Sequence, residues 1–151
     1  MDFSFSEEQI ALKKELIQFA ENELNDNLIE RDKQAHFSRE NWKKCAQMGI
    51  QGLPFPRKYG GSEADIVTTM VAMEGLGYGC RDSGLLFSIN AQMWAVQTPI
   101  AEFGTEAQKE KYLPGLIKGE IIGAHGMSEP GSGSDAFNMN TTATRHGDKY
   151  I

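Results

Sequence analysis

The sequence has few cysteines and histidines, and their positions argue against a metal or disulfide scaffold. Cys45 and Cys80 lie far apart, and His36, His125 and His146 are isolated from one another. Structural zinc sites and disulfide frameworks need several such residues at short, regular spacing. We therefore expect two buried thiols and no metal site.

Excess positive charge and long apolar runs are also absent. Fifteen Lys and Arg against 21 Asp and Glu give a formal net charge of −6, which repels nucleic-acid phosphates and anionic lipid. No apolar run approaches the roughly 20 residues that a membrane-spanning helix needs. The first residues are acidic, whereas a signal or transit peptide would be basic. We therefore expect a cytoplasmic protein with no nucleic-acid partner and no membrane partner.

Residues 1–120 carry apolar residues at helical spacing between clear helix start and stop signals. Ser6-Glu7-Glu8-Gln9 and Thr105-Glu106-Ala107-Gln108 can each form a capping box. Ser38 and Asp65 are further candidates for N-caps, and Gly49 can end the helix that starts at Ser38. The pattern predicts a mainly α fold, with about five helices in an up-and-down arrangement.

Some segments of this region depart from a simple helical pattern. Residues 30–34 lose the periodicity and are interpreted as a frayed helix end and a connection. Residues 52–61 are too rich in Pro and Gly for a helix, but their large apolar side chains predict an ordered loop. Residues 83–103 form a nearly uncharged, central helix, which Pro99 should bend or break. Pro114 likewise implies a kink or a short break in the last helix.

After residue 120 the pattern changes to that of strands. Residues 121–128 are interpreted as a strand, and residues 140–145 alternate in polarity. His146-Gly147-Asp148 is a candidate hairpin turn leading into the last three residues. We therefore expect a helical domain over residues 1–120 and the first strands of a β-barrel-like domain over 121–151. The rest of that domain is expected to lie outside this chain or in another chain.

The stretch Gly126-Met127-Ser128-Glu129-Pro130-Gly131-Ser132-Gly133-Ser134-Asp135 follows the first predicted strand. Its glycines can adopt backbone angles that are closed to other residues, which leaves several N–H groups free to meet an oxygen-rich ligand. The same composition is equally consistent with an ordinary Ser/Gly turn.

This stretch, with two segments before it, resembles the acyl-CoA dehydrogenase family. Met127 to Asp135 is similar to the family's flavin signature. Met48-Gly49-Ile50-Gln51-Gly52-Leu53 through Tyr59-Gly60-Gly61 resembles its helix-to-loop segment. Phe103-Gly104-Thr105-Glu106-Ala107-Gln108-Lys109 through Tyr112-Leu113-Pro114 resembles the entry to its fifth helix.

The resemblance implies an FAD-dependent oxidoreductase of fatty acid metabolism that removes an α-proton and a β-hydride from an acyl thioester, leaving a trans-2-enoyl product. The thioester would be carried by CoA or by an acyl carrier protein, and the electron acceptor would be an electron-transferring flavoprotein. Full members are commonly tetramers, so a homo-oligomer or a complementing half is expected. The family's catalytic base is expected beyond Ile151, so this chain alone is expected to be inactive.

The resemblance also assigns roles to residues of the loop. The Ser128 hydroxyl and nearby N–H groups would donate hydrogen bonds to the flavin, and Ser134 would contact the CoA portion of the substrate. Asp135 is interpreted as closing the turn, and Glu129 is not expected to be the base. The residues expected to line the cofactor are His125, Gly126, Met127, Ser128, Glu129, Pro130, Gly131, Ser132, Gly133 and Ser134.

Phe87, Asn90 and Trp94 fall on one face of the nearly uncharged helix over residues 83–103. They are candidates for the wall of an acyl-binding pocket, and a role as plain core residues is equally consistent. The buried amide of Asn90 would need hydrogen-bond partners that an apolar core lacks.

Two other functions are compatible with the same residues. The chain could be a non-catalytic helical module that docks an acyl carrier, CoA or a partner subunit. It could also belong to a flavin oxidase or monooxygenase with the same fold, because a fold does not fix the reaction.

Overall fold

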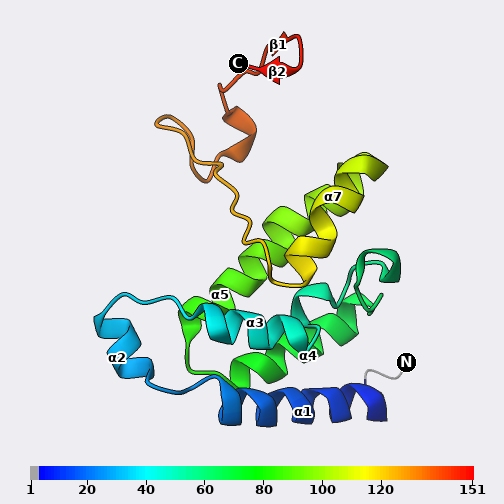
Figure 1. Ribbon diagram of the computed structural model, residues 1–151, viewed down its shortest axis with the longest axis vertical. Coiled ribbons are helices and arrows are strands. Elements are labelled where there is room, and N and C mark those ends of the chain that lie inside the picture. The colour runs from blue at the N-terminus through cyan, green and yellow to red at the C-terminus, as the bar shows by residue number, and fades with distance from the viewer. Residues whose placement is uncertain (1–3) are drawn as a thin grey trace.

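A computed structural model describes residues 4–151, and this part of the chain is mainly helical, as the sequence predicts (Figure 1). One two-stranded antiparallel sheet, β1–β2, lies near the carboxyl end. The elements are α1 (Glu7–Glu23), α2 (Leu28–Lys33), α3 (Arg39–Gln47), the 3₁₀ turns η1 (Ile50–Gly52) and η2 (Arg57–Tyr59), α4 (Ile66–Gly79), α5 (Ser83–Ala91), the π-helix η3 (Gln92–Gln97), α6 (Thr98–Phe103), α7 (Glu106–Ile117), the 3₁₀ turn η4 (Ala136–Asn138), β1 (Arg145–His146) and β2 (Lys149–Tyr150).

The helix starts follow the predicted caps. The Ser6 hydroxyl accepts a hydrogen bond from the Gln9 N–H at 3.2 Å, and the Gln9 side chain accepts one from the Ser6 N–H at 3.0 Å. Thr105 forms the corresponding capping box at the start of α7. The Ser38 and Asp65 side chains cap α3 and α4. All four predicted caps are confirmed. They form because each side chain satisfies a backbone N–H that the helix itself leaves free.

The segment before α3 differs from its prediction. Residues 30–34 were expected to be a frayed connection, but Leu28–Lys33 forms the short helix α2. The Arg31 guanidinium anchors this helix, because it donates to the Asp82 carboxylate at 2.8 Å and to the Leu24 carbonyl at 3.3 Å. Asn27 has a left-handed φ of 51° and separates α2 from α1.

The core lies between α1, α3, α4, α5 and α7, and Trp42, Ile50, Leu76 and Leu113 are among its fully buried side chains. The loop of residues 52–61 closes this core with Leu53, Phe55 and Tyr59, all buried. The predicted ordered loop is therefore confirmed. Cys45 and Cys80 are buried free thiols, also as predicted, and burial raises the pKa of Cys45 to about 12.

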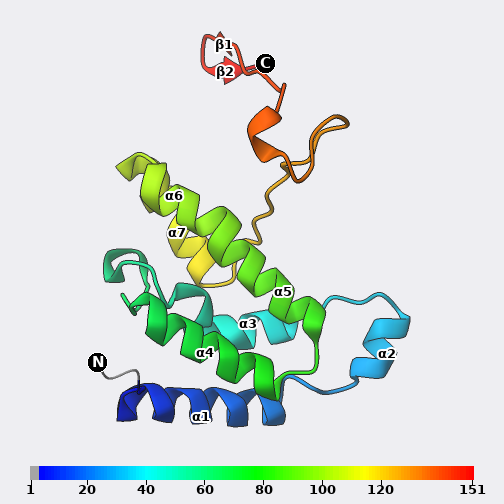
Figure 2. The same cartoon turned by 180° about the vertical axis from the view of Figure 1, so that it is seen from behind.

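Helices α5 and α6 are joined by the π-helix η3 into one continuous rod (Figure 2). Pro99 lies two residues after the end of the wider π-helix, in the first turn of α6. A proline lacks an N–H and its ring crowds the carbonyl four residues earlier, so a wider turn before it relieves this clash. The Met93 carbonyl accepts two hydrogen bonds from Thr98, one from its N–H and one at 2.9 Å from its hydroxyl. The predicted irregularity near Pro99 is confirmed.

Helix α7 runs through Pro114 to Ile117 without interruption. The alternative of a break at Pro114 is therefore wrong. Pro114 cannot donate to the carbonyl of Glu110, but Glu110 is exposed, so solvent can satisfy this acceptor at low cost.

The segment after α7 leaves the helical body and ends in the hairpin β1–β2 (Figures 1 and 2). The predicted turn at Gly147 and Asp148 is confirmed, with Arg145 opposite Tyr150 and His146 opposite Lys149. The strand predicted for residues 121–128 is wrong, because these residues pair with no other strand in residues 4–151. An extended segment becomes a strand only beside a partner that accepts its hydrogen bonds.

Within residues 4–151 no helix is both long and apolar enough to cross a membrane. The same residues contain no group of three or more His, Cys, Asp or Glu side chains that could hold a metal ion.

Close contact between α1 and α4 depends on glycines of α4. A Cβ added at Gly75 would lie 2.7 Å from the Lys13 carbonyl oxygen of α1, and one added at Gly79 would lie 2.5 Å from that of Ile17. A Cβ added at Gly77 would meet nothing within 4 Å. The two helices therefore touch at their backbones along one face of α4.

We predict opposite effects for alanine at two glycines of α4. Gly75→Ala should lower the free energy of unfolding by about 1–3 kcal/mol, because the backbone of α1 must move away. Gly77→Ala should raise it by about 0.5–1 kcal/mol, because alanine favours the helix and meets no obstacle. Urea unfolding followed by circular dichroism measures both, and an equal effect of the two changes would contradict this packing.

Candidate functional site

The candidate cofactor loop, residues 125–135, lies outside the helical body and is largely exposed (Figures 1 and 2). A tight turn forms its centre. The Glu129 N–H donates to the Ser132 carbonyl at 2.8 Å, and the Ser132 N–H donates back to the Glu129 carbonyl at 3.1 Å. Pro130 and Gly131 occupy the tip of this turn, where proline presets the backbone angle.

Ser132 is the buried residue of the loop, with 5% of its surface exposed. Its hydroxyl donates to the Asp135 carbonyl at 2.6 Å, and that carbonyl also accepts from the Asn138 N–H at 3.1 Å. Asp135 therefore closes the turn, as expected, but through its backbone carbonyl. The Ser132 hydroxyl is committed to this bond, and so its role here is to shape the loop.

Glu129 binds the segment that follows the loop. Its carboxylate accepts hydrogen bonds from the Asn140 N–H at 2.8 Å and the Thr141 N–H at 2.9 Å. The hydrogen bonds from Thr141 and Asn140 lower the pKa of Glu129 below its ordinary value. A general base needs a pKa raised toward neutrality, so this environment does not suit Glu129 for proton abstraction.

The first half of the loop offers unused hydrogen-bond donors. Within residues 4–151, the N–H groups of Gly126, Met127 and Ser128 and the Ser128 hydroxyl have no protein partner. All three residues are exposed. Adjacent free donors of this kind can bind an oxygen-rich or electron-rich ligand.

The glycines of the loop have open space where a side chain would begin. A Cβ added at Gly126, Gly131 or Gly133 would meet nothing within 4 Å. None of the three has a left-handed φ, so the expected use of backbone angles closed to other residues is wrong here. Their small size serves instead to let another group approach the backbone closely.

The candidate acyl-pocket residues lie on the rod α5–η3–α6. The Trp94 Nε1–H donates to the Asn90 Oδ1 at 3.2 Å, and the Asn90 amide donates to the Leu86 carbonyl at 3.0 Å. Asn90 thus has the partners that its partial burial requires. Phe87 is 74% exposed, so it is not a core residue in this chain. It presents an aromatic ring on the outer side of α5.

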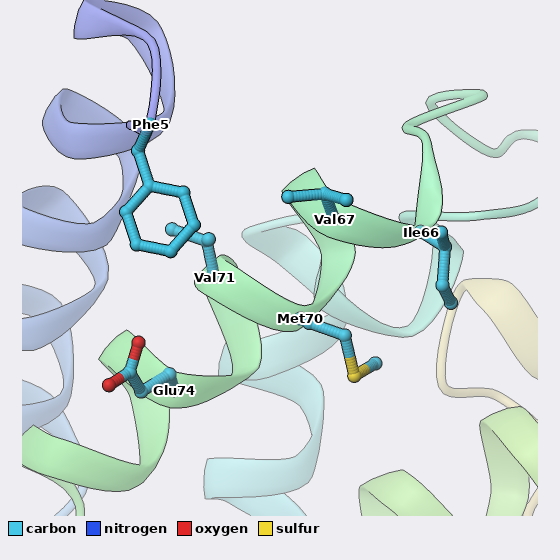
Figure 3. A pocket seen from close by; sticks show the side chains of 6 residues that line it. All are labelled: Phe5, Ile66, Val67, Met70, Val71 and Glu74. Atoms are coloured by element: carbon cyan, nitrogen blue, oxygen red, sulfur yellow. The ribbon is translucent and has the colours of Figure 1, made fainter. Parts of the chain in front are cut away.

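A separate apolar cavity of about 380 Å³ lies between the amino end and α4 (Figure 3). The Phe5 ring lies beside Val71, and Ile66, Val67 and Met70 complete the apolar lining. The single charged residue of the lining, Glu74, is paired with Lys13 at 2.7 Å. The cavity includes none of the predicted site residues, and it has no free polar group for chemistry.

Sequence reasoning missed Gln92, which contacts the chain just before the loop. Its Oε1 accepts a hydrogen bond from the Gly123 N–H at 2.8 Å, and its side chain is 1% exposed. A polar residue inside the nearly uncharged stretch 83–103 was the available signal. The partner could not be identified, because it lies 31 residues away in the sequence.

The pKa of Glu129 predicts how the loop responds to acid. A carboxylate with a lowered folded-state pKa contributes stability above its ordinary pKa and loses it as the pH falls through the folded value. The Asn140 and Thr141 amides should therefore lose protection, relative to the intrinsic exchange rate at each pH, once Glu129 is protonated, and amide exchange measured by NMR across acidic pH would detect this loss. Glu129→Gln should remove this pH dependence. The same acid response in that variant would contradict the assignment.

Comparison with known proteins identifies the family of this chain. Residues 6–120 match the family model described as acyl-CoA dehydrogenase, N-terminal domain. The chain is 40% identical over all of its 151 residues to the short-chain-specific acyl-CoA dehydrogenase of Clostridium acetobutylicum, and covers 39% of that protein. The solved prolyl acyl carrier protein oxidase AnaB is 49% identical, with a TM-score of 0.93 over 98% of this chain and 39% of AnaB.

A solved structure of PigA with FAD and proline is 38% identical, with a TM-score of 0.93 over the whole of this chain and 39% of PigA. The chain thus spans about two fifths of the length of these relatives. The family model covers most of the chain, and the relative from Clostridium acetobutylicum matches all 151 of its residues. The chain therefore belongs to the acyl-CoA dehydrogenase family.

Proposed function

We propose that this chain is the amino-terminal part of an FAD-dependent oxidoreductase that dehydrogenates a thioester between its α and β carbons. The observation that carries the proposal is the exposed loop with free donors at Gly126, Met127 and Ser128, within a chain of this family. PigA, which is similar over the whole of this chain, was solved with FAD. In the reaction, the α carbon loses a proton, the β carbon loses a hydride, and a carbon–carbon double bond forms between them.

The residues of the loop fit the proposed cofactor. FAD, when bound, accepts the hydride equivalent from the substrate. The Ser128 hydroxyl and the N–H groups of Gly126 and Met127 are free to donate hydrogen bonds to an electron-rich ring edge. Fixed donors of this kind stabilise negative charge where it develops. The open space at Gly131 and Gly133 would let the ligand lie against the backbone.

We assign the catalytic base to the part of the protein that longer relatives have and this chain does not. Glu129, the carboxylate inside the signature, is held ionised by the Asn140 and Thr141 amides. It therefore contributes to loop structure. Three further expectations from the family belong to this proposal. They are a domain boundary at residue 120, a homo-oligomeric state and an electron-transferring flavoprotein as the electron acceptor.

For the substrate, we propose a thioester on a carrier protein. AnaB, a prolyl acyl carrier protein oxidase, is 49% identical to this chain, whereas the short-chain acyl-CoA dehydrogenase of Clostridium acetobutylicum is 40% identical. In this proposal Phe87, Asn90 and Trp94 form a wall of the acyl site, and Ser134 contacts the pantetheine arm that carriers and CoA share. The exposed ring of Phe87 supplies apolar surface for this contact.

A substrate comparison tests the proposed function. The completed protein is defined here as this chain joined to the part of AnaB that extends beyond it. We expect it to be yellow, and to reduce a dye acceptor faster with prolyl carrier protein than with butyryl-CoA. The 151-residue chain alone should give no turnover. Faster reaction with butyryl-CoA would overturn the substrate assignment, and turnover by the chain alone would overturn the placement of the base.

We further predict that Ser128→Ala weakens FAD binding by the completed protein about tenfold, the effect of losing one hydrogen bond to a buried ring. Ser62→Ala is the control, because Ser62 is an exposed serine outside the candidate cofactor loop. It should leave FAD affinity unchanged. Flavin fluorescence titration measures the affinity. If both variants bind FAD like the parent, Ser128 does not hold the cofactor.

A further inference from the structure

The chain leaves α7 through a tightly defined C-terminal turn. Gly119 has a left-handed φ of 69°, and its N–H donates to the Leu116 carbonyl at 3.1 Å. The Glu120 N–H donates to the Gly115 carbonyl at 3.0 Å. This pair of bonds is the Schellman motif, which reverses the chain at a helix end. It directs residues 121–123 back across α7.

Residues 121–123 then pack against the helical body. A Cβ added at Gly115 would lie 2.6 Å from the Ile121 Cδ1, so Ile121 lies against the bare backbone of α7. A Cβ added at Gly123 would lie 2.7 Å from the Val96 Cγ1 of η3 and 3.3 Å from the Leu116 Cδ2. Gly123 thus lies between η3 and α7, in a space that admits no side chain.

The Gln92 amide fixes Gly123 in this space. Its Oε1 accepts the Gly123 N–H at 2.8 Å, and its Nε2 donates to the Leu116 carbonyl and to the Gln97 Oε1, each at 3.1 Å. Gln92 therefore binds the end of α7 and the start of the exit segment with one buried side chain. Between Gly123 and the free donors of the loop lie two residues, Ala124 and His125.

We infer that Gln92 is a positioning residue for the cofactor loop: by holding Gly123 against η3, it sets where the donors of Gly126, Met127 and Ser128 lie. This inference rests on the proposed function. Gln92 and Trp94 lie on the same π-helix, η3. The Trp94 Nε1–H donates a hydrogen bond to Asn90, and both residues belong to the proposed acyl wall. Gln92 thus ties the cofactor segment to the element that carries the acyl wall.

Gln97 supplies a matched control. Its side chain is also buried, and its Nε2 donates to the Gln51 carbonyl at 2.8 Å. Its Oε1 accepts from Gln92, but when Gln97 is replaced, Gln92 keeps its bonds to the Leu116 carbonyl and the Gly123 N–H. Replacing either glutamine with methionine keeps the side-chain length and removes a buried amide. Gln92→Met leaves the Gly123 N–H and the Gln97 Oε1 without this partner, and Gln97→Met leaves the Gln51 carbonyl without its partner. Both changes should therefore lower the melting temperature. The Gly123 hydrogen bond is lost in Gln92→Met alone.

The first measurement is amide hydrogen exchange of Gly123 by NMR in the 151-residue chain. We expect Gln92→Met to speed this exchange about tenfold or more, the loss corresponding to one hydrogen bond, and Gln97→Met to leave it near the parent value. Gly123→Ala should also release the segment, because its Cβ would meet Val96. That variant replaces Gln92→Met if the latter does not fold. Equal exchange in the Gln92 and Gln97 variants would overturn the inference.

The second measurement is FAD affinity of the completed protein. Gln92→Met should weaken it about tenfold, with Gln97→Met close to the parent. Faster Gly123 exchange with unchanged FAD affinity would overturn the positioning role. A completed parent protein that takes up no FAD would overturn the proposed function and the cofactor role of Gln92 with it. In that case faster Gly123 exchange in Gln92→Met would still support the contact between Gln92 and Gly123. Failure of the proposed function can therefore be distinguished from failure of that contact.

Discussion

Three buried glutamine side chains hold the helical body and the cofactor segment in one arrangement. Gln51 donates to the Trp42 carbonyl at 3.0 Å, Gln97 to the Gln51 carbonyl, and Gln92 to the Leu116 carbonyl and Gln97. They connect α3, η1, η3 and α7 inside a mainly apolar core. An unpaired buried polar group costs about 1–3 kcal/mol. Moving any one of these elements would break its hydrogen bond to a neighbouring element and leave such a group unpaired.

Local sequence signals predicted the elements that depend on local chemistry. The caps at Ser6, Ser38, Asp65 and Thr105 involve partners within one turn, and all four formed as expected. Helix α2 was missed because its anchor, the Arg31–Asp82 ion pair, spans 51 residues. A strand at residues 121–128 was predicted wrongly because a β-like pattern does not supply a partner strand.

In the candidate site, too, sequence predicted the features with nearby partners and missed those with distant partners. The composition of the loop indicated a turn with free N–H groups, and the resemblance added flavin to that interpretation. The use of Glu129 to bind the Asn140 and Thr141 amides could not be predicted, because those residues lie beyond the turn. Gln92 was missed for the same reason. Polar side chains whose partners are distant in sequence need coordinates before a role can be assigned.

The proposed function gives the loop the central role of binding the cofactor. The relatives are about two and a half times as long as this chain, since it covers 39% of each. In this proposal the loop contributes the cofactor donors, the helical body contributes part of the acyl wall, and the remaining polypeptide contributes the base.

The most direct test of this account is an amide-exchange footprint of FAD on the completed protein, measured by mass spectrometry with and without the cofactor. The account predicts that FAD slows exchange in residues 125–134 and leaves α1 unchanged. Protection confined to other segments, with residues 125–134 exchanging at the same rate in both states, would contradict it.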